Sequence, residues 1–349
     1  MLWTSLLYLF LLDHSHALHH MKTRASAKLA SAEERPLRIR NHCPVDIYPA
    51  IATQNGRGPS TGGYRAQPGN TTSFTVSADW QGRIWGRTNC SFNEQGTGPK
   101  VEGGWFGTGQ ACLTGDCGGV IDCKGTGQPA TLAEFTMSSD MNLSFYDISL
   151  VDGYNLPIAI VSLHTESDDP SLASIPSNTT NPVCIGSPNF LLPLESLNDT
   201  TATVPVNITV DSITYKTPLE ESLERHAVSR WCPWSLQLQP PPKPGDGVFP
   251  YPDDNIPRPD FDPCLSSCAK YGRDEDCCAG NHNSPSTCGP NLYSKTAKKV
   301  CPDAYSYAYD DITSTFTIRE GAGFEVIFCP KGRSTNIQQK IHGQGQNFF

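Results

Sequence analysis

GTGQACLTGDCGGVIDC, residues 107–123, is the most specific stretch of this sequence. Its cysteines, Cys112, Cys117 and Cys123, are packed around the tripeptide Thr-Gly-Asp at 114–116, and they belong to a set of 14 in the chain. Thiols that are kept reduced in the cytosol rarely accumulate in such numbers, whereas secreted chains oxidise them into disulfides. The even count therefore predicts a secreted, disulfide-linked protein and disfavours the rival interpretation, a cysteine-rich zinc site.

The N-terminus agrees with secretion. Residues 2–12 (LWTSLLYLFLL) are mostly apolar, and a small-x-small site, Ser-His-Ala, ends at Ala17. This pattern predicts a signal peptide at 1–17, followed by an unstructured segment at 18–36. The tail at 331–349 has no hydrophobic anchor, so we expect an extracellular or cell-wall protein.

Glycosylation sequons fit the same route. Three of them fall between 178 and 209, in a stretch rich in Ser, Thr, Pro and Asn that we interpret as part of an exposed insertion at about 165–230. The sequon at Asn89 is the poorest acceptor, because its central residue is a cysteine that we expect to be disulfide-bonded. The expected sites are Asn70, Asn142, Asn178, Asn198 and Asn207.

The composition excludes several classes of protein. The 349 residues leave room for about two domains, and the net charge of −9 is opposite in sign to the basic footprint of a nucleic-acid binder. No stretch after the N-terminus has about 18 consecutive apolar residues, so no membrane span is expected. The 30 glycines and 29 prolines indicate a loop-rich chain, and we find no internal repeat.

Alternation of apolar and polar residues predicts many short strands separated by Gly and Pro, which indicates a mainly β protein. Two helices are also expected. One spans Pro218–Arg230, with Thr217 as its cap, and the other runs from Asn291 to Lys299. The expected strands are LRIRN (37–41), TSFTV (72–76), RIWGRT (83–88), TLAEFTM (131–137), LSFYDISLV (143–151), PVNITV (205–210), TSTFTI (313–318) and FEVIF (324–328).

Further motifs accompany residues 107–123. They are RIWGRTNC (83–90), TLAEF (131–135), YDISLVDGYNLP (146–157), CLSSC…CC (264–278), CPDAYSYAYDD (301–311) and FEVIFCP (324–330). In this order they resemble the thaumatin-like, pathogenesis-related family that includes osmotin and zeamatin. The resemblance runs from about Leu37 to Pro330.

The resemblance implies a mainly β fold, a thaumatin-like flattened β-sandwich with a disulfide-rich second lobe and a small loop domain closed by disulfides. On this chain the thaumatin-like domain would span 37–330. The sandwich would take 37–87, 131–183 and 302–330, the small loop domain 88–130 and the second lobe 184–301. In the family an acidic cleft lies between the sandwich and the second lobe.

The resemblance also implies how the cysteines pair. The family pattern has one further bridge, and both of its cysteines are missing here, one of them replaced by Arg319. A paired loss leaves no orphan thiol. The implied bridges are Cys43–Cys329, Cys90–Cys112, Cys117–Cys123, Cys184–Cys301, Cys232–Cys264, Cys268–Cys277 and Cys278–Cys288.

Alternation also indicates where the acidic side chains point. In TLAEFTM, Ala133, Phe135 and Met137 share one face, so Glu134 points to the other. In SFYDISLV the residues on either side of Asp147 form the more apolar face, so Asp147 points away from it. If the two strands are neighbours in one sheet, both carboxylates project from its non-core side.

The cleft signature of the family is one Arg, one Glu and three Asp. Carried over motif by motif, it falls on Arg83 (RIWGRT), Glu134 (LAEF), Asp147 (YDIS), Asp152 (LVDG) and Asp310 (YAYDD), where Asp311 could replace Asp310 by one register step. Clustered carboxylates raise one another's pKa. Glu134 is therefore the expected general acid of a glycosidase, with Asp147 or Asp152 as the opposing carboxylate.

These features predict a secreted protein that binds β-1,3-glucan, or a related cell-wall polysaccharide, in the acidic cleft. Whether it is an enzyme stays open, since the resemblance implies no more than a weak endo-β-1,3-glucanase with an antifungal or wall-remodelling role. The alternative in the same family is a non-catalytic inhibitor of a secreted amylase, xylanase or protease. We expect a monomer without cofactor or metal, and neither nucleic acid nor a membrane span.

Overall fold

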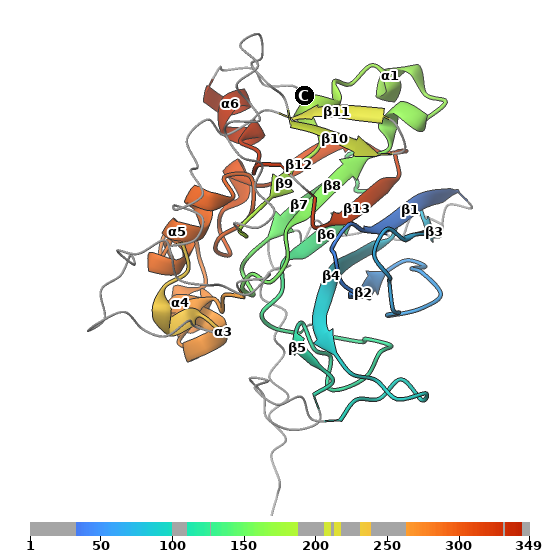
Figure 1. The fold of residues 1–349 in the computed structure, drawn as a ribbon. Coiled ribbons are helices and arrows are strands. Elements are labelled where there is room, and N and C mark those ends of the chain that lie inside the picture. Colours follow the sequence, from blue (N-terminus) through green and yellow to red (C-terminus); the bar gives the residue numbers. More distant parts are fainter. Residues whose placement is uncertain are drawn as a thin grey trace, which may run out of the picture.

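Two β-sheets form the centre of the protein in a computed structural model (Figure 1). The first sheet has five strands in the order β3 (Thr71–Ser77), β1 (Glu34–Asn41), β13 (Phe324–Phe328), β8 (Ile158–Ser162) and β9 (Val183–Cys184). The second has six, in the order β12 (Phe316–Arg319), β7 (Leu143–Ser149), β6 (Leu132–Thr136), β4 (Gln81–Cys90) and β2 (Tyr48–Asn55), with β5 (Cys112–Thr114) paired to β4. A separate hairpin joins β10 (Val206–Val210) and β11 (Ile213–Thr217).

The structure describes residues 33–99, 110–125, 127–187, 206–210, 213–217, 231–238, 263–330 and 332–343. The predicted signal peptide at 1–17, the sequon at Asn198 and the helix expected at 218–230 lie outside these residues. Most described helices are short. They are α1 (Pro170–Ala173), α3 (Ser267–Tyr271), α4 (Asp274–Cys277), α5 (Leu292–Val300) and α6 (Ile337–Gly343), and α3 to α5 gather on one side of the strands (Figure 1).

The core lies between the two sheets and is rich in aromatic side chains. Phe135 of β6 and Tyr146 of β7 point from the six-stranded sheet onto Phe324 of β13, with ring centroids 5.2 and 4.7 Å from that of Phe324. All three are at most 1% exposed. Burying an aromatic side chain of this size stabilises the fold by roughly 2–3 kcal/mol, and it fixes which face of β6 and β7 turns outward.

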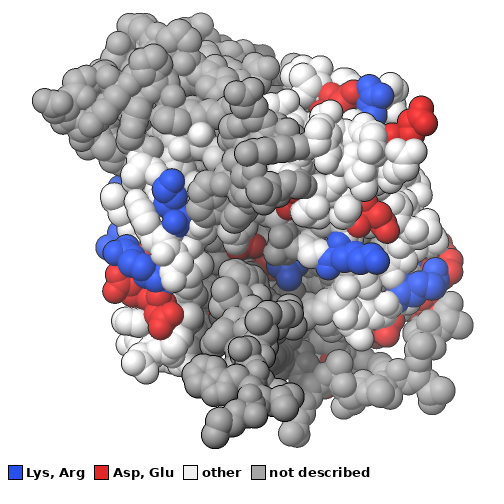
Figure 2. Space-filling view, turned by 90° about the horizontal axis from the view of Figure 1, so that it is seen from below, with Lys and Arg blue, Asp and Glu red and all other residues white. Residues whose placement is uncertain are grey.

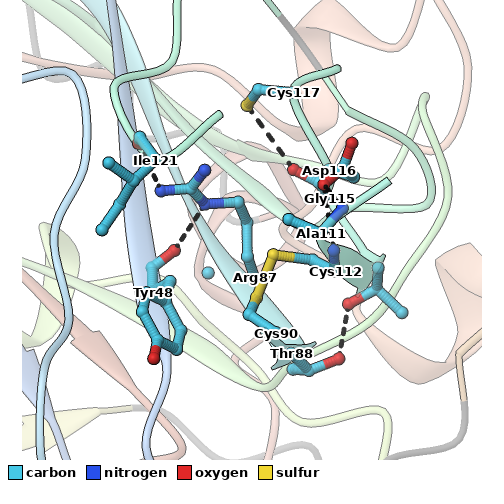
Figure 3. Close-up of a disulfide and its surroundings, with 12 residues drawn as sticks. Tyr48, Arg87, Thr88, Cys90, Ala111, Cys112, Gly115, Asp116, Cys117 and Ile121 are labelled. Atoms are coloured by element: carbon cyan, nitrogen blue, oxygen red, sulfur yellow. Dashed lines mark hydrogen bonds between the residues drawn. A yellow bond between two sulfur atoms is a disulfide. The ribbon is translucent and has the colours of Figure 1, made fainter. Parts of the chain in front are cut away.

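A buried arginine of β4 holds the chain at residues 120 and 121 against the sandwich. Arg87 is fully buried and donates to the carbonyl oxygens of Tyr48 (3.0 Å) and Ile121 (2.7 Å) (Figure 3). It also donates to the carbonyl oxygen of Val120 (2.8 Å). Nearby, Gly115 has a φ of +67°, and a Cβ there would lie 2.8 Å from a Trp85 side-chain atom. The Thr-Gly-Asp turn therefore requires glycine at its centre.

Seven disulfides link the chain, and no described cysteine is free. They are the pairs that the resemblance implies: Cys43–Cys329, Cys90–Cys112, Cys117–Cys123, Cys184–Cys301, Cys232–Cys264, Cys268–Cys277 and Cys278–Cys288. Two of them, Cys268–Cys277 and Cys278–Cys288, lie within residues 266–288, where apolar sequence is sparse. Each such bridge stabilises a fold by about 2–4 kcal/mol, so this described segment depends on cross-links more than on a core.

The structure corrects two segment boundaries. The segment expected to be unstructured, 18–36, is extended from Glu34 onward, because β1 begins there and its first residues pair with β3. Within the segment interpreted as a C-terminal tail, 331–349, the described residues 332–343 contain α6, and Ile337 of that helix is 1% exposed within the main core. Of the expected glycosylation sites, Asn70, Asn142 and Asn178 are exposed, whereas for Asn207 only its place on β10 is described.

Candidate functional site

Three charged residues form a row across the centre of the six-stranded sheet. Arg83 of β4 is in register with Glu134 of β6, and Glu134 is in register with Asp147 of β7. Directly opposed residues of an antiparallel pair have Cβ atoms about 5 Å apart, so the three side chains emerge next to one another. Their sequence neighbours on β6 and β7 belong to the core. The row therefore projects from the outer, non-core face, as alternation predicts.

The two carboxylates of the row are buried yet incompletely satisfied. Glu134 is 4% exposed and Asp147 is 3% exposed. Glu134 Oε1 and Asp147 Oδ1 are each buried without a hydrogen-bond partner, and Arg83 Nη1 lies 3.9 Å from Glu134 Oε1, beyond hydrogen-bond length. An unmade hydrogen bond at a buried polar atom costs about 1–3 kcal/mol, so the row retains acceptor atoms that a bound hydroxyl group can satisfy.

Burial and mutual repulsion favour a shared proton on the pair. Burial raises the pKa of Glu134, the Arg83 guanidinium opposes that rise, and Asp152 adds to it. Burial raises the pKa of Asp147 well above its usual range, and the charges of Glu134 and Asp311 raise it further. Both shifts favour one proton held by the pair at a pH where an isolated carboxyl group is ionised. Arg83 Nη1, 3.9 Å from Glu134 Oε1, favours the ionised form of Glu134.

Asp152 lies beyond the end of β7, where the chain turns. Gly153 follows with a φ of +106°, and a Cβ there would lie 2.5 Å from the Cys264 carbonyl oxygen. Gln128 Nε2 donates a 2.9 Å hydrogen bond to Asp152 Oδ1. The Asp152 carboxylate is close enough to Glu134 to raise the pKa of that group. Asp152 is half-buried, so its carboxylate lies at the solvent-accessible edge of the charged row.

The fourth carboxylate near the row is Asp311, the register alternative to Asp310. Asp310 Oδ2 accepts from the Ser306 amide (3.0 Å) and lies 3.1 Å from Lys298 Nζ of α5, so its charge is already paired. Asp311 accepts a 2.9 Å hydrogen bond from the Tyr305 hydroxyl and acts electrostatically on Asp147. Asp310 is thus engaged in an ion pair with Lys298, whereas the neighbouring Asp311 acts on Asp147.

We call Arg83, Glu134, Asp147, Asp152 and Asp311 the acidic cluster. Figure 2 shows basic and acidic side chains side by side on the described part of the face seen from below. Two members of the cluster, Glu134 and Asp147, are buried, while the other three are partly exposed. Such an arrangement can accept hydrogen bonds from hydroxyl groups, attract a cation, or transfer a proton.

The residues that support the acidic cluster were missed by sequence reasoning. The Ser149 side chain hydrogen-bonds Glu134, and its parity with Asp147 along β7 could have revealed it. Tyr305, Gln128 and Lys298 act from loops and a helix, where no periodicity marks them. Within the described parts of the chain, no group of three or more His, Cys, Asp or Glu side chains is arranged to hold a metal ion, and no helix has the length and apolar character of a bilayer span.

Comparison with known proteins shows wide similarity to one family. The family model described as "Thaumatin family" matches residues 41–330. The chain is 34% identical over 295 residues to pathogenesis-related protein 5 of Arabidopsis thaliana, covering 84% of this chain and 89% of the relative. It is 32% identical over 295 residues to pathogenesis-related thaumatin-like protein 3.5 of Cryptomeria japonica (83% and 88%). It is also 30% identical over 303 residues to a Prunus avium protein named glucan endo-1,3-beta-glucosidase (86% and 92%).

Proposed function

This chain belongs to the thaumatin family, and from that premise we propose that it is an extracellular protein that binds β-1,3-glucan over the acidic cluster. The row of Arg83, Glu134 and Asp147 carries the proposal, because its unpaired acceptor oxygens suit sugar hydroxyl groups. The Prunus avium relative supports the choice of sugar through its name. Seven disulfides support an oxidising, extracellular location.

We further propose slow endo-hydrolysis of the same glucan. Glycoside hydrolysis needs one protonated carboxyl at the leaving oxygen and one carboxylate opposite it, at about 5–5.5 Å in retaining enzymes and about 6.5–9.5 Å in inverting ones. Glu134 and Asp147 are directly opposed on adjacent strands, which favours the shorter, retaining separation. In place of Glu134, the acid expected from the sequence, we propose Asp147 as the proton donor, because Arg83 lies 3.9 Å from Glu134 and favours its ionised form. Glu134 would then be the opposing carboxylate. Burial of both limits substrate access, so we expect binding to exceed turnover.

The test compares four proteins on a soluble β-1,3-glucan: wild type, Asp147→Asn, Glu134→Gln and the control Asp140→Asn. Asp140 is exposed in the loop between β6 and β7. Calorimetry measures binding, and a reducing-end assay measures cleavage. The D147N variant keeps the uncharged state of the protonated acid, so it should bind but not cleave. E134Q should lose cleavage and bind more weakly, because it removes the charge facing Arg83, while D140N should match the wild type.

Two results would contradict this proposal. Equal cleavage by wild type and D147N would exclude Asp147 as proton donor. If the wild type neither binds nor cleaves the glucan, the acidic cluster is not a glucan site, and the non-catalytic hydrolase inhibitor becomes the better account of the protein.

A further inference from the structure

The C-terminal helix α6 lies outside the residues that the family model matches, which end at 330. The chain reaches it along β9. The Thr335 amide donates to the Val183 carbonyl at 2.9 Å, and the Ile185 amide donates to Ser334 Oγ at 2.9 Å. Ile337, the first residue of α6, is then buried in the main core. This segment is thus an integral part of the sandwich that the matched family region does not include.

The first turn of α6 is tied to both ends of the loop that carries Asp311. At residue 303, the Asp303 carboxylate accepts from the amides of Ile337 (2.8 Å) and Gln338 (2.9 Å). At residue 315, the Thr315 carbonyl accepts a 2.9 Å hydrogen bond from Gln338 Nε2. Asp303 and Gln338 are both buried, at 1% and 7% exposed. A single helical turn therefore fixes the two ends of residues 303–315 at a set separation.

The same loop connects directly to the acidic cluster. The Tyr305 amide donates to the Ile148 carbonyl at 2.8 Å, which places Tyr305 beside β7. The Tyr305 hydroxyl donates to Asp311 Oδ1 at 2.9 Å and contacts Thr315 Oγ1 at 2.5 Å. Thr315 is thus held by Gln338 through its carbonyl oxygen and by Tyr305 through its hydroxyl group. A continuous chain of contacts runs from α6 to the Asp311 carboxylate.

We infer that Gln338 is a positioning residue for the acidic cluster, and that α6 acts as a brace that holds the Asp311 carboxylate near Asp147. The inference rests on the proposed function for its consequence, glucan binding, but its structural part does not. The Thr315 amide also donates to the Asp311 carbonyl oxygen at 3.0 Å, so the position of Thr315 is passed on to Asp311. Without the Gln338 amide, Thr315 loses one of its three contacts, and Asp311 gains freedom to move away from the sheet. The negative charge facing Asp147 would then weaken.

The charged and titratable groups that face Asp147 are known from each neighbouring element. They are Glu134 on β6, Arg83 on β4 beyond it, Asp152 after β7, and Tyr305 and Asp311 on the loop. Only the last two depend on α6 through the contacts described above. When the contact between Gln338 and Thr315 is lost, the negative charge of Asp311 moves away from Asp147 while Arg83 stays in place. The titration of the Glu134–Asp147 pair therefore shifts toward lower pH.

The experiment uses Gln338→Ala, with Gln339→Ala as a matched control on the same helix, since Gln339 is exposed. Carboxyl ¹³C NMR titration of the unliganded, secreted protein follows the apparent pKa values of the pair. We expect Q338A to lower the upper midpoint by about half a pH unit and to weaken binding of a soluble β-1,3-glucan several-fold. Q339A should match the wild type in both measurements.

A shift in midpoint without a change in glucan affinity would support the brace and count against the proposed function instead. If Q338A lowers only the melting temperature, with midpoint and affinity unchanged, Gln338 is merely structural and the inference is overturned. Tyr305→Phe breaks the same chain of contacts at its other end without touching α6. It should shift the midpoint in the same direction, and it serves as the deciding variant if Q338A is not secreted.

Discussion

Replacing Asp147 by asparagine should make the protein more stable at neutral pH. Asp147 is buried, one of its oxygens has no hydrogen-bond partner, and it faces Glu134 across the strand pair. When both groups ionise, the fold holds two adjacent negative charges in a site that water barely reaches. An introduced amide removes one charge and offers a donor to Glu134 Oε1. Relief of one unmade hydrogen bond is worth about 2 kcal/mol, or about 3 °C in melting temperature for a chain of this size.

The pH dependence of that gain follows from the direction of the pKa shift. The folded pKa of Asp147 lies above its unfolded value because of burial and the charges of Glu134 and Asp311. At pH values below the unfolded pKa of about 3.9, Asp147 is protonated in both the folded and the unfolded protein and costs no stability. The free energy of unfolding then falls as pH rises through the folded pKa, because the unfolded chain ionises this group more easily. Calorimetric scans at one fixed rate should show D147N melting higher than wild type at pH 7 and equal to it near pH 3. A variant that melts lower at pH 7, or a gap that persists near pH 3, would refute the reasoning.

Two further predictions concern the scaffold. Arg87→Lys keeps the positive charge, but the lysine cannot reach all the carbonyl oxygens to which the guanidinium donates. The loss of about 3 kcal/mol of local stability should make residues 88–130 cleavable by protease while the rest of the protein resists. Uniform resistance would contradict the role of Arg87. Cys43 and Cys329 are 286 residues apart, and Cys268 and Cys277 are 9 apart. In the chain-entropy model the first bridge contributes about 5.6 kcal/mol and the second about 2.6 kcal/mol. The double-serine variant of the first pair should therefore melt lower than that of the second, and the reverse order would contradict the model.

Local patterns were sufficient where a side chain's direction depends only on its own strand. Alternation along TLAEFTM and SFYDISLV placed Glu134 and Asp147 on the non-core side, and the register brings them face to face. The helix expected at 291–299 forms as α5, with Asn291 as its cap. Strand β2 was not predicted, because its first half is buried and its second half is exposed, so no alternation marks it.

Interactions between distant segments set what local patterns could not show. The choice between Asp310 and Asp311 depends on Lys298, which reaches their loop from α5. Helix α6 has only seven residues. Its first amide, that of Ile337, donates a hydrogen bond to the Asp303 carboxylate, which is more than thirty positions earlier in the chain. The raised pKa values of Glu134 and Asp147 likewise depend on burial and on tertiary neighbours, which include Arg83 for Glu134 and Asp311 for Asp147.

The central claim is that glucan binds over the acidic cluster, and a crystal structure of the protein soaked with a linear β-1,3-glucan hexasaccharide tests it most directly. We predict sugar density along the six-stranded sheet, with hydroxyl groups within hydrogen-bond distance of Arg83 and of at least one of Glu134 and Asp147. Asp152 and Asp311 should contact the same oligosaccharide at its two sides. Sugar density confined to another surface, such as the turn around residues 112–123, with none over the acidic cluster, would contradict the claim.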